Sequence, residues 1–124
     1  MLGNVDAFSS FSVNDLQRAK HFYDGTLGLD VSEGNGMLFL HVRAGRILVY
    51  PKDDHTPATF TVLNFPVDNV EQVVDQLAER GVTFEQYNDM PAEPDEKGIY
   101  RGFGPDIAWF KDPAGNVLAV VQNA

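Results

Sequence analysis

An internal repeat constrains the fold of this chain more than any other feature. Residues 106–121 hold two apolar runs on either side of Asp-Pro-Ala-Gly-Asn at 112–116. Aromatic and β-branched residues that flank a turn with Pro and Gly predict a β-hairpin. Residues 39–49 align with 109–119 at a shift of 70 residues, so that Ala-Gly-x-(Ile/Val)-Leu coincides in both. A repeat at a fixed spacing predicts that the chain contains two copies of one structural unit.

A second alignment, at a shift of 54 residues, extends the repeat to the start of each copy. Residues 11–16 and 65–70 are both an apolar strand end followed by two Asp or Asn residues and an aliphatic residue, which is typical of a strand that leads into a capped helix. In the first copy we predict a strand over 5–13, a helix from the N-cap Asn14 to Gly28, a strand over 29–32, and a hairpin of 37–42 with 46–50. In the second copy we predict a strand over 59–67, a helix from an Asp68–Asn69 cap to Gly81, and a strand over 82–87. An acidic loop over 88–98 follows, which is either plain surface or a lid over a site, since its length suits both. It would lead into a strand that begins within 99–103 and ends at 110.

This order of elements predicts an α+β fold made of two tandem βαβββ modules in a single domain, 1–124. Module 1 would span about 4–51 and module 2 about 59–122, with a polar linker over 52–58.

The composition narrows the classes of function. With 44% hydrophobic and 22% charged residues, 124 residues can bury the core of one ordinary domain. The absence of cysteine excludes disulfides, a thiol nucleophile and a thiolate metal site. A net charge of −9 argues against nucleic acid and anionic membranes as partners. No apolar run has the length of a membrane span and no signal pattern precedes the first strand, so we expect a cytoplasmic protein.

Two segments resemble a known family. Residues 11–16, with His-Phe-Tyr at 21–23 and Leu-Gly-Leu at 27–29, and Trp-Phe-Lys-Asp-Pro-Ala-Gly-Asn at 109–116 are similar to the vicinal oxygen chelate superfamily. That superfamily contains glyoxalase I, extradiol dioxygenases, fosfomycin-resistance transferases and bleomycin-binding resistance proteins. The resemblance covers nearly the whole chain and implies a cup-shaped open barrel, commonly completed or shared in a homodimer. It is specific for the fold and not for a reaction.

The resemblance also bears on metal binding. In catalytic members a divalent metal lies in the cup, held by His or Glu at two strand positions of each module. The matching positions here are Phe8, Val49, Val62 and Ala119. None of these side chains offers the oxygen or imidazole donor that such metals need. We therefore expect no metal at the family site and no cofactor.

Strand alternation predicts which side chains line the cup, because successive residues of a strand face opposite sides. The repeat mates Ser10 and Asn64 would form a polar floor, and the repeat mates Trp109 and Phe39 would form aromatic walls. An aromatic residue on an alternating strand is more often part of a core, so that alternative stays open. The predicted ligand-binding residues are Phe8, Ser10, Phe39, His41, Val49, Phe60, Val62, Asn64, Tyr100, Trp109 and Ala119.

Three functions fit this picture. The chain could bind and sequester a small organic molecule, such as an antibiotic-like compound, in an aromatic-walled cup without metal. Alternatively it could be a lyase, isomerase or other small-molecule enzyme that uses side chains alone, with His41 as general base. It could also be a scaffold whose cup is filled by its own side chains. We favour the binder and expect a homodimer that binds neither nucleic acid nor membranes.

Overall fold

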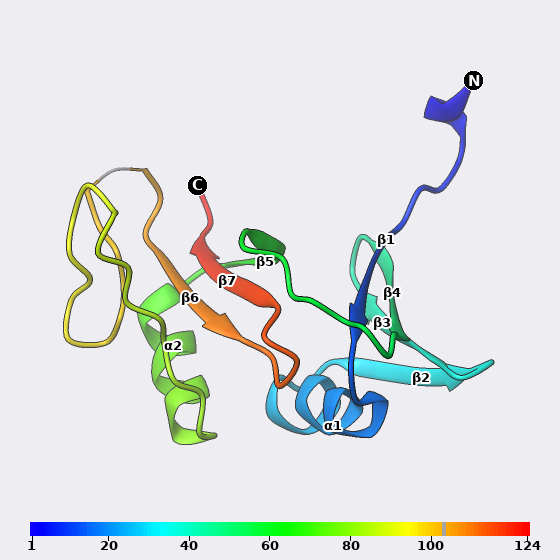
Figure 1. Ribbon diagram of the computed structural model, residues 1–124. Helices are drawn as coiled ribbons and strands as arrows, with labels where there is room; N and C mark the ends of the chain where they lie inside the picture. Colours follow the sequence, from blue (N-terminus) through cyan, green and yellow to red (C-terminus); the bar gives the residue numbers. More distant parts are fainter. Residues whose placement is uncertain (103) are drawn as a thin grey trace. The chain divides into compact units, whose positions relative to one another are not determined.

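A computed structural model describes residues 1–102 and 104–124 of the chain. They form two compact units, unit 1 at Met1–Thr56 and unit 2 at Pro57–Ala124, and the division falls inside the segment 52–58. Each unit contains one sheet and helical segments, so the α+β class is confirmed (Figure 1).

Unit 1 is built on a four-stranded sheet in the order β1-β4-β3-β2. β1 runs parallel to β4, and the other neighbours are antiparallel. The first strand starts later than the predicted residue 5, because the residues before it have no partner strand. The elements are η1 (Leu2–Asn4), β1 (Ser9–Val13), α1 (Leu16–Lys20), a π-helix η2 (His21–Thr26), β2 (Asp30–Gly34), β3 (Met37–Val42) and β4 (Gly45–Pro51).

The helical segment of unit 1 begins one residue later than predicted. Asp15, not Asn14, is the N-cap, and its carboxylate accepts a hydrogen bond from the amide of Arg18. A carboxylate at this position is as good a cap as an Asn amide and also interacts favourably with the helix dipole. The helical segment ends at Thr26, and Gly28, where the end was predicted, follows with φ of 74°.

One face of the unit 1 sheet packs against the helical segment. Phe11 on β1 contacts Tyr23, with ring centroids 6.0 Å apart. Cross-strand pairing places Leu38 and Val49 in line with Phe11, and residues paired across a sheet share a face. Val49 is therefore on the helix-covered face and is 0% exposed, so the prediction that it faces the cup was wrong. The other face of this sheet carries the side chains that alternate with these.

Unit 2 has a three-stranded sheet in the order β5-β7-β6, with β7 parallel to β5 and antiparallel to β6. Figure 1 shows α2 lying along one side of this sheet. Asn69 caps α2 by accepting from the amide of Gln72, and the chain turns out of the helix at Gly81, with φ of 91°. The elements are β5 (Thr61–Val67), α2 (Val70–Glu79), β6 (Ile107–Lys111) and β7 (Val117–Gln122).

The predicted hairpin of unit 2 is confirmed, and its turn is organised by Asp112. This buried carboxylate accepts hydrogen bonds from the amides of Ala114 and Asn116 and from the Asn116 side chain, at 2.9 to 3.0 Å. Gly115 adopts φ of 85°, which a residue with a side chain would tolerate poorly. The Asp-Pro-x-Gly-Asn sequence is thus a self-capped turn between β6 and β7.

The strand predicted over 82–87 does not form. Among the described residues, the backbone of this segment is joined to β6 by one isolated bridge, between Phe84 and Phe110, and by one hydrogen bond, from the Glu85 amide to the Trp109 carbonyl. The next amide that could extend the pairing, that of Tyr87, donates instead to the Tyr100 hydroxyl at 2.6 Å. The Tyr100 side chain has replaced a backbone carbonyl of β6 as the acceptor, so the strand pairing does not continue.

The strand predicted to begin within 99–103 and end at 110 begins only at Ile107, as β6, so its predicted start was wrong. The backbones of Tyr100 and Ile107 exchange two hydrogen bonds as an antiparallel pair, so the chain reverses direction between them. Gly102 and Gly104 have positive φ in this reversal. Phe103 lies outside the described residues.

The two sheets also correct the repeat. In unit 1 Phe39 pairs with Leu48, and in unit 2 Trp109 pairs with Ala119. The shift is thus 70 residues on the first arm of the hairpin and 71 on the second, because the turn of unit 2 is one residue longer. The counterpart of Ala119 is therefore Leu48, not Val49.

Candidate functional site

The face of the unit 2 sheet opposite α2 carries the only tryptophan. Trp109 pairs with Ala119, which pairs in turn with Asn64, so all three share this face. The indole Nε1 donates a hydrogen bond of 2.9 Å to the hydroxyl of Thr61. That bond holds a half-buried ring in one orientation on the sheet. We call this the Trp109 face.

Two tyrosines complete an aromatic cluster on the Trp109 face. Tyr87 and Tyr100 lie with their ring centroids 5.6 and 5.2 Å from that of Trp109, both in edge-to-face geometry. This is the arrangement that aromatic quadrupoles favour. Tyr100 is fully buried beneath the segment that it holds through the Tyr87 amide, whereas Tyr87 is only half buried. Burial, and then the nearby Glu85 carboxylate, raise the pKa of the Tyr87 phenol above its ordinary 10.0, so it remains a neutral donor at neutral pH.

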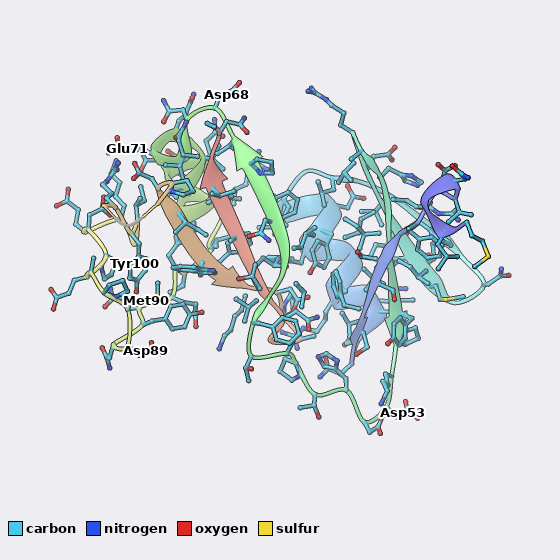
Figure 2. The ribbon with its side chains drawn as sticks, turned by 90° about the horizontal axis from the view of Figure 1, so that it is seen from above. Asp53, Asp68, Glu71, Asp89, Met90 and Tyr100 are labelled. Carbon is cyan, nitrogen blue, oxygen red and sulfur yellow. The ribbon has the colours of Figure 1, made fainter. Side chains whose placement is uncertain are left out.

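A pocket of about 270 Å³ adjoins this cluster. Tyr87 belongs to both, since it contacts Trp109 and also lines the pocket with Met90 and Glu93 (Tyr100 and Met90 are labelled in Figure 2). The remaining lining residues come from the acidic loop and from the segment just before it, and they are Gln86, Asn88, Ala92 and Pro94.

The end of the acidic loop is held by Asp95. Its carboxylate accepts from the amides of Lys97 and Ile99, both at 2.9 Å, and from the Arg101 guanidinium at 3.2 Å. Burial raises the pKa of Asp95, but these hydrogen bonds outweigh that effect and hold the pKa below its ordinary value of 3.8. The carboxylate is thus ionised at neutral pH and keeps the loop in place.

The charges of unit 2 favour a neutral or cationic ligand. Lys97 pairs with Glu71 and Asp75, and Arg101 with Asp95 and Asp106, at 2.7 to 3.2 Å. Lys111 pairs with Glu85 at 3.4 Å. These basic side chains are neutralised by carboxylates, while Glu93 faces the pocket itself.

In unit 1, the sheet face without helices carries a different cluster. The guanidinium carbon of Arg46 lies 4.9 Å from the ring centroid of Phe8 and 5.5 Å from that of Phe39. These are cation–π distances. Arg46 pairs across the hairpin with His41, whose Nε2 lies 2.7 Å from the Ser32 hydroxyl.

A second histidine of unit 1, His55, lies in the predicted linker. Its Nδ1 lies 2.6 Å from the Ser12 hydroxyl, and the residue is half buried. The pair ties the end of unit 1 back to β1.

Eight of the eleven predicted ligand-binding residues lie in two groups, one in each unit. Unit 1 brings together Phe8, Phe39 and His41 around Arg46, with Ser10 exposed on the same face. Unit 2 brings together Trp109, Tyr100, Ala119 and Asn64. The remaining three lie apart from both groups: Val49 under the helix, Phe60 at 68% exposure ahead of β5, and Val62 at a register irregularity.

That irregularity explains a residue which the sequence analysis missed. The pairing of β5 with β7 shifts between Thr61 and Leu63, so Thr61 lies opposite Val117 and Val62 is the extra residue. The Thr61 hydroxyl can consequently accept the hydrogen bond from Trp109. No sequence pattern predicted the bulge. Arg46 was also missed, although counting back from the Ala44–Gly45 turn would have placed it opposite His41.

Among 1–102 and 104–124, no three His, Cys, Asp or Glu side chains come together as a metal site would require. No helix in that part of the chain has both the length and the apolar character to cross a membrane.

Comparison with known proteins identifies the family. The family model of the Glyoxalase/Bleomycin resistance protein/Dioxygenase superfamily matches residues 7–120. No curated protein matches the chain. Among solved structures, a member of this superfamily from Sphaerobacter thermophilus is similar at a TM-score of 0.72, with 21% identity over 99% of this chain and 100% of that one.

Two further structures carry functional names. TnmS3, an antibiotic binding protein from a Streptomyces species, has a TM-score of 0.67 and 24% identity, over 98% of both chains. A lactoylglutathione lyase from Agrobacterium tumefaciens has a TM-score of 0.68 and 18% identity, over 97% of this chain and 94% of that one. These identities show a common fold and not a common function. The chain belongs to the Glyoxalase/Bleomycin resistance protein/Dioxygenase superfamily.

Proposed function

We propose that this protein binds a small planar organic molecule, neutral or cationic, on the Trp109 face of unit 2, without the help of a metal. The observation that carries the proposal is the fixed, half-buried indole of Trp109, oriented by Thr61 and flanked by Tyr87 and Tyr100. A rigid aromatic surface next to a pocket is typical of small-molecule sites. Sequestration of an antibiotic-like compound would be one use of such a site.

Charge is the second argument. The pocket beside Tyr87 is lined by Glu93, and the cations Lys97, Arg101 and Lys111 are already paired. An anionic ligand would find no free cation among them, whereas a cationic ring would gain from both the carboxylate and the aromatic faces.

Titration of Trp109 emission tests the proposal. Wild-type protein is titrated with planar aromatic compounds in matched neutral, cationic and anionic forms, and we expect saturable quenching by the neutral or cationic ones. Phe84→Leu is the control, because Phe84 packs on Phe110 on the opposite side of the sheet and its loss leaves the reporter in place. Quenching by the anionic forms alone, or by none, would overturn the proposal.

An enzyme that uses His41 is the alternative. The observation in its favour is the 2.7 Å contact between His41 Nε2 and the Ser32 hydroxyl, which resembles a base beside a nucleophile. The pair is exposed on the surface of unit 1. Turnover of any bound compound that is lost in His41→Gln while binding persists would favour this alternative over simple binding.

We also propose that the chain forms a homodimer. Large apolar side chains are exposed near the start of the chain and ahead of β5: Met1 at 99%, Leu2 at 73% and Phe60 at 68%. Exposed apolar groups of this size favour association. Light scattering after size exclusion should give twice 13.7 kDa, and a particle of 13.7 kDa would contradict the proposal.

A further inference from the structure

Unit 1 contains a pocket of its own, of about 770 Å³, which the proposed function does not use. Phe8, His41 and Arg46 line it, together with Asp6 and the small residues Ala44 and Gly45 of the β3–β4 turn. All of these belong to unit 1, so the pocket can be discussed without reference to unit 2.

Arg46 differs from the paired cations in its surroundings. Within the described part of the chain, no carboxylate lies within ion-pair distance of its guanidinium, whereas Lys20 pairs with Glu33 at 3.3 Å in the same unit. Its contacts are the two rings of Phe8 and Phe39. Cation–π contacts restrain the group without using its N–H bonds, so the planar fork remains available for a bidentate acceptor.

His41 adds a second polar group beside Arg46. It lies directly across the hairpin, and its Nε2 is engaged by Ser32, which restrains the ring. The turn residues Ala44 and Gly45 leave space at the rim, and a Cβ built on Gly45 would meet nothing within 4 Å. A planar acceptor can therefore approach the guanidinium from the turn side.

We infer that this pocket binds the carboxylate of a small aromatic acid, held by Arg46, with the ring of the acid lying against Phe8. Asp6 also lines the pocket, and its negative charge opposes an anion there. The site is thus weakened by its own carboxylate, and removal of that charge should tighten binding. This inference does not rest on the Trp109 face, because no residue is shared between them.

Two-dimensional NMR of the full chain, with the arginine Nε signals resolved, tests the inference with 2-naphthoate and its neutral isostere 2-naphthamide. We expect naphthoate to shift the Arg46 Nε signal saturably and to bind more tightly than the amide. Arg46→Gln should weaken naphthoate about 10-fold or more, since hydrogen bonds between charged groups are lost, and leave the amide unchanged.

The matched control is Arg43→Gln. Arg43 is exposed in the same turn, so its replacement changes the net charge equally while the cation–π contacts remain. We expect Arg43→Gln to change naphthoate affinity less than about 2-fold, since exposed charges are screened. Asp6→Asn should tighten naphthoate binding. Equal losses in Arg46→Gln and Arg43→Gln, equal binding of acid and amide, or no saturation would each overturn the inference.

Discussion

Gly98 offers the sharpest test of how the acidic loop packs on the rest of unit 2. It adopts φ of 90° at the end of the acidic loop, and a Cβ built there would lie 2.7 Å from the Cβ of Phe84. Gly98→Ala therefore imposes two costs, an unfavourable φ of about 1–2 kcal/mol and an overpacked contact of about 1–3 kcal/mol. Because the contacted atom is next to the backbone of Phe84, it cannot move aside as the tip of a long side chain would.

Gly81→Ala separates the two costs. Gly81 has φ of 91°, yet its Cβ would meet nothing within 4 Å. Both variants share the φ strain and the change in the unfolded chain, so their difference isolates the contact with Phe84. Urea unfolding should give Gly98→Ala a free energy of unfolding about 1–3 kcal/mol below that of Gly81→Ala, or a melting temperature about 4–12 °C lower. Equal stability of the two variants would mean that the loop does not pack on Phe84.

Three further predictions concern the polar groups of the sites. A double-mutant cycle of Trp109→Phe and Thr61→Val should give a coupling of about 0.5–1.5 kcal/mol in urea unfolding, as expected for one hydrogen bond, and a coupling near zero would mean that Thr61 does not orient the indole. Folding lowers the pKa of Asp95, so the stabilisation that its ionised carboxylate gives the loop should be complete above pH 3.8 and be lost as the pH falls further. The chemical shift of the Ile99 amide proton, which donates to Asp95, should titrate with a midpoint below pH 3.8. A midpoint above 3.8 would refute this prediction. Elemental analysis of untagged protein should find no stoichiometric transition metal, because Phe8, Leu48 and Ala119 have no donor atoms, and one metal per chain would contradict this.

The fold was largely predictable because the repeat and the turn chemistry agree. The hairpin around Asp112, the exits from the helices at Gly28 and Gly81, and the turn at Asn35–Gly36 all follow from residues with strong local preferences. Asn35 and Gly36 have φ of 53° and 73°, as a tight hairpin of this kind requires. Local signals of this strength need no tertiary information.

The predictions that were wrong depend on contacts between residues that lie far apart in the sequence or on the lengths of turns. The predicted strand over 82–87 does not pair further with β6 because the Tyr87 amide donates to the Tyr100 hydroxyl, which lies 13 residues away in the sequence. Val49 was placed on the wrong face because one added residue in the second turn changed the repeat shift from 70 to 71, and a slip of one residue reverses the face. The bulge at Thr61 could likewise not be predicted from the sequence, since the residues around it have the β-branched and apolar character of a regular strand.

The candidate site was predicted in part. Trp109, Phe39 and Phe8 were expected to share the ligand face by strand alternation. The register places Trp109 and Phe39 on the open faces of their sheets, and Phe8 lies against Arg46. Tyr87 was not selected, because its orientation depends on a segment that is not a strand. Alternation therefore finds side chains on regular strands and misses those that irregular segments bring to the same face.

Native mass spectrometry of the untagged protein with the best neutral or cationic compound tests the central claim most directly. Wild type and the control Phe84→Leu should each carry one compound per chain, and Trp109→Leu should bind it about 5- to 30-fold more weakly, because about 1–2 kcal/mol of aromatic contact is removed. Equal occupancy in Trp109→Leu and wild type, or no bound compound in any of the three, would contradict the account.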